Sequence, residues 1–203
     1  MGNSFSNMKK KIVILGSTGS IGSTTVQIIK NNLKDFNAIA ISTNKNVKKI
    51  YKQAKEIKVK NVIISDLNSY LSYKDKFKKR KIKVFNNHFE FKKYLKIKID
   101  YTMCAISGIE GLKPTLDAIK YSKTVGIANK ESIICAWNLI EKELNKNKTK
   151  FIPIDSEHFS IWSLIKNVKK CDIDEIIITA SGGPFLKLPI SKFKKIKPSS
   201  AVK

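Results

Sequence analysis

The amino-acid sequence predicts an α/β fold built around a doubly wound parallel sheet. Short apolar runs alternate with segments in which apolar residues recur at helical spacing, and this alternation continues to residue 154. A glycine-phased turn joins the first apolar run to the first helical segment. The pattern then changes, so we expect one domain over residues 1–150 and the beginning of a second over residues 151–203.

The first four elements show the alternation most clearly. Residues 9–15 form an apolar run that begins with lysines and ends at a glycine, as expected for a buried parallel strand. Residues 21–31 place apolar side chains on one helical face, and two asparagines end the pattern. Residues 38–42 are a second apolar strand, and residues 47–57 again have one apolar helical face.

The same reasoning assigns the later elements in chain order. We expect strands over residues 61–65, 83–85, 101–106, 124–127 and 151–154, because each is a short apolar run. Between them we expect helices over residues 67–77, 89–95, 112–121 and 132–145, where apolar residues recur every three or four positions. In the second part we expect a helix over 160–168, an apolar strand over 175–180, a sharp turn over 181–184 and a lysine-rich irregular segment from residue 188.

Three glycines follow the first expected strand, at Gly16, Gly19 and Gly22. A glycine turn between a first strand and a first helix is the context of dinucleotide-binding sites. Gly16 would permit the tight turn, Gly19 would let a pyrophosphate approach the backbone, and Gly22 would let the helix pack against the sheet. The pattern therefore favours a bound dinucleotide, with an ordinary glycine turn as the alternative.

The second expected strand runs into Ser42, Thr43, Asn44, Lys45 and Asn46. An NAD site usually has Asp or Glu here, which accepts hydrogen bonds from the ribose hydroxyls. This chain has hydroxyls, amides and one cation instead, which suit a 2′-phosphate. We therefore predict NADP rather than NAD; the alternative is a solvated polar loop.

Two carboxylates, Asp155 and Glu157, lie where the last strand of the expected sheet ends. Residues two apart on a strand point the same way, and Mg²⁺ and Mn²⁺ prefer carboxylate oxygens. Two carboxylates are few for a tight site, so a third ligand or the substrate would be needed. An equally good interpretation is that Asp155 caps the following helix. His158 is better explained as a packed or capping residue than as a ligand.

The charge balance is extreme, with 40 basic residues against 16 acidic ones and a net charge of +24. The lysines are spread along the whole chain, and Arg80 is the only arginine. Readout of base edges depends heavily on arginine, so we expect a compositional bias and no nucleic-acid partner. No apolar run approaches the length of a membrane span, and we expect no membrane partner.

The three cysteines, Cys104, Cys135 and Cys171, stand far apart and form no C-x-x-C pair. Each lies among apolar neighbours, so we expect three buried free thiols. This pattern indicates a reduced, cytoplasmic protein.

Four segments in order carry a family resemblance. Gly16-Ser-Thr-Gly-Ser-Ile-Gly22, Ala128-Asn-Lys-Glu-Ser132, Asp155-Ser-Glu-His158 and Ser181-Gly-Gly-Pro-Phe185 closely resemble the 1-deoxy-D-xylulose 5-phosphate reductoisomerase family. The resemblance implies a Rossmann-like NADP-binding domain followed by the start of an α+β catalytic domain. It also implies conversion of 1-deoxy-D-xylulose 5-phosphate to 2-C-methyl-D-erythritol 4-phosphate, in isoprenoid biosynthesis, with NADPH and Mg²⁺, Mn²⁺ or Co²⁺.

The resemblance further implies roles for individual residues. The cofactor-binding residues would be Thr18, Gly19, Ser20, Ile21, Asn44, Lys45, Asn46, Asn129 and Glu131. The substrate-binding residues would be Lys130, Ser156, Glu157 and Ser181. Asp155 and Glu157 would be the metal ligands, and Lys130 and Glu157 the catalytic residues.

The chain departs from the family after the segment that begins at Ser181. The family carries a third metal carboxylate and a helical domain beyond this point, whereas here no Asp or Glu follows Glu175. We therefore expect the N-terminal part of a longer enzyme, a homodimer when full length, with weak or no turnover on its own. The alternatives are another NADP-dependent oxidoreductase and an NADP-binding module without chemistry.

Overall fold

The computed structural model describes residues 8–90, 92, 98–178 and 183–201. The chain separates into two compact units, Met1–Ile154 and Asp155–Lys203. The last strand of the sheet pairs within the first of these units.

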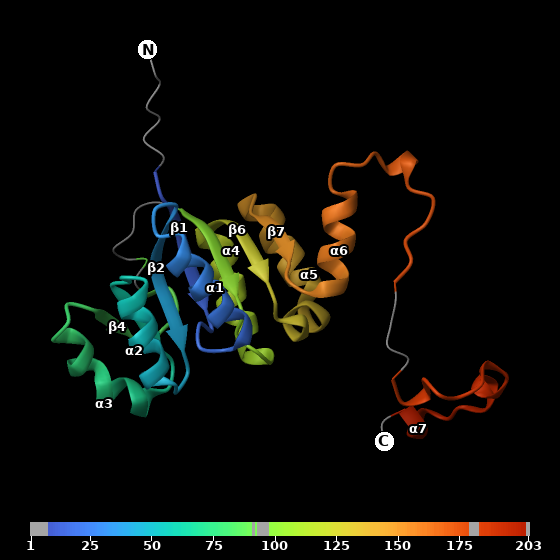
Figure 1. Cartoon of the computed structure of the whole chain (residues 1–203), viewed down its shortest axis with the longest axis horizontal. Coiled ribbons are helices and arrows are strands. Elements are labelled where there is room, and N and C mark those ends of the chain that lie inside the picture. Colours follow the sequence, from blue (N-terminus) through green and yellow to red (C-terminus); the bar gives the residue numbers. More distant parts are fainter. Residues whose placement is uncertain (1–7, 91, 93–97, 179–182, 202–203) are drawn as a thin grey trace, which may run out of the picture. The chain divides into compact units, whose positions relative to one another are not determined.

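A seven-stranded sheet forms the centre of the first unit, in the order β4-β3-β2-β1-β5-β6-β7, and every neighbouring pair of strands is parallel (Figure 1). The strands are β1 (Lys10–Leu15), β2 (Phe36–Thr43), β3 (Asn61–Ile64), β4 (Lys83–Phe85), β5 (Ile99–Cys104), β6 (Ser122–Ile127) and β7 (Lys150–Pro153). This architecture confirms the predicted Rossmann-like α/β fold.

Helices cover the two faces of the sheet in two groups. The helices of the first unit are α1 (Ser20–Asn31), α2 (Val47–Glu56), α3 (Leu67–Lys78), α4 (Leu112–Tyr121) and α5 (Lys130–Asn147), with a 3₁₀ turn η2 (Ile109–Gly111) before α4. One core cluster joins α1, α2 and α3 to one face of the sheet, and it includes the fully buried Ile50 and Phe77. The other cluster joins α4 and α5 to the opposite face through Ile119 and Ile140.

The strand order reverses between β1 and β5. The first four strands proceed outward from β1 in one direction, and β5 then returns to the other side of β1. In open parallel sheets a crevice forms at such a switch point, outside the carboxyl ends of the strands. The glycine turn after β1 and the loop after β5 therefore meet at this crevice.

Most predicted elements of the first unit are confirmed within a few residues. The helix expected over residues 89–95 falls mainly on positions outside the described residues. The buried polar residue Gln53, on the inner face of α2, is an exception to the expected apolar pattern of that helix.

The second unit differs from expectation in two places. Helix α6 (Ser156–Ile165) begins four residues earlier than predicted, because Asp155 caps it. The expected strand over residues 175–180 is wrong for its described part, 175–178, which has no regular structure. Its side chains Ile176, Ile177 and Ile178 are exposed, and the described residues of this unit provide no strand to pair with.

The rest of the described second unit consists of short helical turns. They are η3 (Lys170–Asp172), η4 (Gly183–Phe185), η5 (Ile190–Lys195) and α7 (Pro198–Ala201). None of the helices in the described parts of the chain is both long and apolar enough for a bilayer span.

The prediction of three buried thiols is correct for Cys104 alone. Cys104 lies in β5 and is buried, whereas Cys135 and Cys171 are exposed. Cys135 points away from the core because it lies on the outer face of α5, and apolar sequence neighbours do not reveal this. Burial raises the pKa of the Cys104 thiol to about 12.

This difference predicts a simple thiol titration. In the native chain Cys135 and Cys171 should react quickly with Ellman's reagent, and Cys104 should react only after denaturant is added. Cys104→Ala should remove the slow thiol and leave the fast ones. Rapid reaction of all three thiols in the folded chain would contradict this assignment.

Candidate nucleotide-binding site

Two neighbouring hollows lie along the carboxyl edge of the sheet, at the switch point. The first, of about 690 Å³, is lined by the ends of β1, β2 and β3, including Gly16, Thr43 and Ser65. The second, of about 270 Å³, lies between the start of α1 and the start of α5 and is lined by Ser20 and Lys130. Gly19 lines both. Their arrangement is suited to a ligand with two halves joined at the glycine turn.

Glycine is needed at the three positions of the turn for different structural reasons. Gly16 has φ of 79°, and a Cβ there would meet the backbone of Ala105. A Cβ on Gly22 would lie 2.6 Å from Ser17 Cα and still nearer to Gly16 O. A Cβ on Gly19 would meet nothing of the chain closer than Gly16 O at 3.5 Å, which is ordinary contact. The fold itself therefore requires Gly16 and Gly22, whereas Gly19 leaves backbone open to the hollow.

A buried polar network holds this turn against β2 and α2. The backbone N–H of Gly16 donates to Ser42 Oγ at 2.8 Å. Gln53 donates from Nε2 to Ser17 O and accepts from Ser17 Oγ, both at 2.8 Å. Since Ser17, Ser42 and Gln53 are each at most 5% exposed, the turn is rigid before any ligand binds. Sequence reasoning missed this role of Gln53, although a polar residue on the inner face of α2 was a usable signal.

The residues predicted for the 2′-phosphate gather at the start of α2. Asn46 caps α2, with its side chain accepting from Lys49 N at 3.2 Å. Asn44 donates to Ser65 Oγ at 3.2 Å, and Lys45 Nζ lies 3.9 Å from Asp66 Oδ1. Each of these side chains already has a partner, either in the loop that follows β3 or in the first turn of α2, so together they fix the shape of this end of the site.

Two further contacts join this region to the glycine turn. The hydroxyls of Thr18 and Thr43 are 2.8 Å apart, and Lys49 Nζ donates to Thr18 O at 2.8 Å. The structure therefore brings the predicted cofactor residues of the turn and of the β2 end together. Ser20 and Ile21, also predicted, are exposed in the first turn of α1, beside the smaller hollow.

Asn129 is the structural centre of the other end. Its side chain is buried, with Nδ2 donating to Ile106 O at 2.6 Å and to Gly108 O at 2.7 Å. Its Oδ1 accepts from Ser132 N at 3.0 Å and so caps α5. With both donors and the acceptor engaged, Asn129 acts on a ligand by holding the loop after β5 against α5.

Lys130 and Glu131 follow directly and are exposed in the first turn of α5, where both line the smaller hollow. The helix is interrupted at Ala136, which has φ of −144° and ψ of 30°, so residues 130–135 form a separate helical segment. Asn129 is therefore the anchor that sets how this segment presents Lys130 and Glu131. In the same segment Ser132 Oγ is buried without a hydrogen-bond partner among the described residues.

His88, in the segment after β4, lines the larger hollow and was not predicted from the sequence. Burial lowers the pKa of its imidazole, with the nearby Asp117 and Lys113 acting in opposite directions. A neutral, partly buried ring suits contact with a flat aromatic base. No local pattern singles out this histidine, because the loop position that brings it to the hollow depends on the sheet order.

The predicted metal residues belong to the second unit. Asp155 Oδ1 accepts from His158 N and lies 2.8 Å from His158 Nδ1, and Ser156 Oγ donates to Glu157 Oε2 at 2.8 Å. The expectation that a strand directs Asp155 and Glu157 the same way is wrong, since β7 ends at Pro153 and both residues lie at the start of α6. Ser181 lies outside the described residues.

The donor chemistry of this helix start fits a hard divalent cation only in part. Two carboxylates in one helical turn provide oxygen ligands of the type that Mg²⁺ prefers. Within the residues that the structure describes, however, no three Asp, Glu, His or Cys side chains form a metal-binding group. A complete coordination shell would require further ligands, as the sequence predicted.

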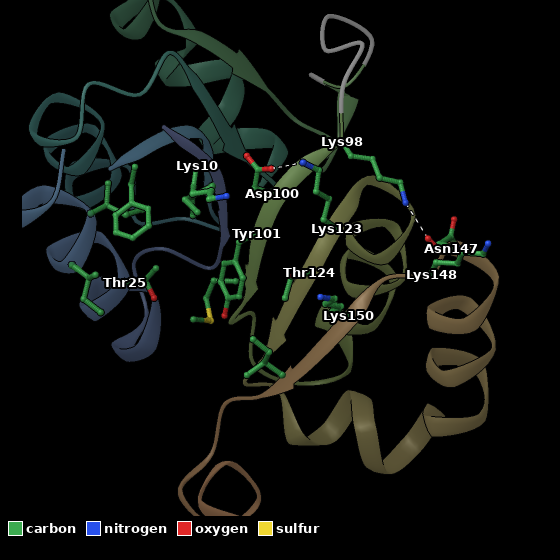
Figure 2. Close-up of a pocket in the computed structure, with 16 residues that line it drawn as sticks. Lys10, Thr25, Lys98, Asp100, Tyr101, Lys123, Thr124, Asn147, Lys148 and Lys150 are labelled. Atoms are coloured by element: carbon green, nitrogen blue, oxygen red, sulfur yellow. Dashed lines mark hydrogen bonds and ion pairs between the residues drawn. The ribbon is translucent and has the colours of Figure 1, made fainter. Parts of the chain in front are cut away.

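Another hollow, of about 910 Å³, lies elsewhere, toward the amino ends of the strands (Figure 2). Its floor is the sheet face around Tyr101 and Met103, and lysines surround it. Lys123 Nζ donates to Asp100 at 2.8 Å, and Lys98 Nζ donates to Asn147 O at 3.0 Å. It has neither a glycine turn nor strand carboxyl ends, so we place the nucleotide site in the two smaller hollows.

Comparison with known proteins agrees with this geometry. Residues 12–137 match the family described as 1-deoxy-D-xylulose 5-phosphate reductoisomerase, and residues 151–203 match the C-terminal domain of that family. A curated relative from Pelagibacter ubique, named 1-deoxy-D-xylulose 5-phosphate reductoisomerase, is 57% identical over 196 residues, which are 96% of this chain and 50% of the relative.

Two solved structures are also similar. The reductoisomerase of Zymomonas mobilis in complex with NADPH superimposes with a TM-score of 0.81 at 34% identity, over 97% of this chain and 52% of that one. A DOX-P reductoisomerase in complex with NADPH, fosmidomycin and magnesium gives a TM-score of 0.77 at 28% identity, over 96% of this chain and 50% of that one. The chain thus spans about half the length of the relatives it matches. Since the first match alone covers more than half of its residues, the chain belongs to the 1-deoxy-D-xylulose 5-phosphate reductoisomerase family.

Proposed function

We propose that this chain supplies the NADPH-binding part, and the first metal- and substrate-binding residues, of a 1-deoxy-D-xylulose 5-phosphate reductoisomerase. The reaction would convert 1-deoxy-D-xylulose 5-phosphate to 2-C-methyl-D-erythritol 4-phosphate. The observation that carries the proposal is the open backbone at Gly19, which a rigid turn holds between two hollows. Family membership and a similar structure that contains NADPH support the same assignment.

The cofactor would lie across the two hollows. Its pyrophosphate would meet the backbone of Thr18, Gly19, Ser20 and Ile21, where the start of α1 favours negative charge. The adenosine would occupy the larger hollow, with its 2′-phosphate near Asn44, Lys45 and Asn46. The nicotinamide would lie in the smaller hollow, beside Asn129 and Glu131.

The residues proposed to bind the substrate come from both units. We assign Lys130 to stabilise negative charge on the substrate and Ser156, Glu157 and Ser181 to bind it. Asp155 and Glu157 would hold a divalent cation, Mg²⁺ or Mn²⁺, with Co²⁺ as another option. When bound, the cation supplies Lewis-acid polarisation of a carbonyl oxygen. A cytoplasmic location and a homodimer for the whole enzyme belong to the same proposal.

A fluorescence titration tests the cofactor assignment directly. NADPH added to this chain should show enhanced or shifted nicotinamide emission that saturates, while NADH should bind much more weakly. Equal affinity for NADH would contradict the assignment of Asn44, Lys45 and Asn46. Failure of either nucleotide to bind would contradict the proposal as a whole.

Asp155→Asn separates the metal role of this residue from its capping role. Asparagine caps helices about as well as aspartate, so α6 should persist, with a change in unfolding free energy of less than about 1 kcal/mol. Loss of the carboxylate should nevertheless remove Mn²⁺ binding, measured by electron paramagnetic resonance in the full-length enzyme, together with turnover. Asp155→Ala should lose both the helix cap and Mn²⁺ binding. An Asp155→Asn enzyme with unchanged Mn²⁺ affinity would show that this carboxylate is only a cap.

A further inference from the structure

Lys49 reaches back from the first turn of α2 to the glycine turn. Side chains in the first turn of a helix tilt toward its amino end, and Lys49 Nζ accordingly donates to Thr18 O at 2.8 Å. The Thr18 hydroxyl is in turn 2.8 Å from that of Thr43, the last residue of β2. The ammonium is therefore held beside both the pyrophosphate turn and the end of β2.

The end of β2 is where a dinucleotide-binding sheet contacts the adenosine ribose. A cation fixed between this strand end and the turn is close to the position of a 2′-substituent. An ammonium has three donors, and Thr18 O accepts from one of them, so two remain for a phosphate.

Lys45, the cation within the segment predicted from the sequence, differs from Lys49 because it has an acidic neighbour. Its Nζ lies 3.9 Å from Asp66 Oδ1, and the side chain is 75% exposed. The nearby Lys45 charge also helps to lower the pKa of the Asp66 carboxyl, after the larger effect of the hydrogen bonds from Ser69. Lys49, by contrast, makes no ion pair within the described residues. Its charge is therefore not offset by an acidic neighbour.

We propose that Lys49 is the principal cation that selects a 2′-phosphorylated adenosine, and hence NADPH over NADH. This inference rests on the proposed function, and it adds a residue outside the Asn44–Asn46 segment predicted from the sequence. Asn44 and Asn46 shape the loop through their own hydrogen bonds, and Lys45 makes the smaller contribution because it is paired with Asp66.

Single lysine substitutions test the assignment by binding alone, without turnover. Lys49→Gln should weaken NADPH and adenosine 2′,5′-bisphosphate by about tenfold, the loss expected for charge-assisted hydrogen bonds, and should leave NADH within about twofold. Lys48→Gln is the matched control: Lys48 is the adjacent exposed lysine in the same helical turn, and its loss should change neither ligand by more than about twofold. Lys49→Arg should retain most of the preference.

Three outcomes would overturn the inference. Equal losses of NADPH affinity in Lys49→Gln and Lys48→Gln would indicate that the two lysines act only through the general positive charge of the chain. Equal weakening of NADPH and NADH would mean that Lys49 supports the turn rather than the 2′-phosphate. A wild-type chain that binds NADPH and fails to bind adenosine 2′,5′-bisphosphate would also reject it, while the proposed function would stand. A wild-type chain that binds adenosine 2′,5′-bisphosphate but neither NADPH nor NADH would instead reject the proposed function alone.

Discussion

Gly19→Ala should remove most NADPH binding and leave the chain folded, whereas Gly22→Ala should destabilise the fold itself. The two glycines lie three residues apart in one motif, and both changes add the same methyl group. Urea unfolding and NADPH titration on the same two variants measure the two effects separately.

The expected difference follows from what each methyl group would touch. At Gly22 it would overlap the backbone of Gly16 and Ser17, which is fixed by the buried Gln53 contacts and cannot shift cheaply. We expect a loss of about 3 kcal/mol or more in unfolding free energy. At Gly19 the backbone has a φ of −72°, which alanine adopts readily, and the nearest atom of the chain is 3.5 Å away. We expect a change of less than about 1 kcal/mol in stability there.

The methyl group at Gly19 would instead occupy space on the ligand side. It would keep a pyrophosphate from reaching the N–H groups at the start of α1, so NADPH affinity should fall by at least about tenfold. Thr24→Ala, on the exposed side of α1, is a control that should change neither measurement. A Gly19→Ala chain with normal NADPH affinity would remove the main support for a dinucleotide at this turn.

The sequence was sufficient for the sheet because its signals are local and repeated. Each strand is an apolar run buried on both faces, each helix has one apolar face, and parallel connections leave few possible arrangements. The glycine motif was predictable for the same reason: the separate roles inferred for Gly16, Gly19 and Gly22 each depend on the absence of a Cβ, a property that only this residue type has.

One prediction failed where a local signal allowed two interpretations, and the others depended on neighbours distant in sequence. Asp155 and Glu157 were placed at a strand end, but capping by Asp155 begins α6 at the next residue. Residues 176–178 are apolar, yet a strand requires a partner that the described residues of this unit do not provide. His88 and Lys49 were missed because their positions at the site arise from the order of the strands and the direction of α2, which no short motif encodes.

Substitution of Asn129 should also have a large effect, in this case on stability. This effect would not be expected if Asn129 only contacted the cofactor. Asn129→Ala would leave the carbonyls of Ile106 and Gly108 and the N–H of Ser132 without their present partner. Because buried polar groups without partners are costly, unfolding free energy should fall by about 3 kcal/mol. Urea unfolding followed by circular dichroism measures this loss.

Asn129→Ser separates the two functions of the side chain. Serine is a good helix cap and can still accept from Ser132 N, but it cannot donate to both carbonyls of the loop after β5. We therefore expect α5 to be retained and the loop to loosen. The loss in free energy of NADPH binding should exceed the loss in free energy of unfolding. If Asn129 instead contacts the nicotinamide directly and has no structural role, both variants should keep wild-type stability and lose affinity equally. The hydrogen bonds of the Asn129 side chain argue against that outcome. Its Nδ2 also fills the space that a Cβ on Gly111 would need. Gly111→Ala should therefore reproduce the Asn129 defect from the opposite side of the contact.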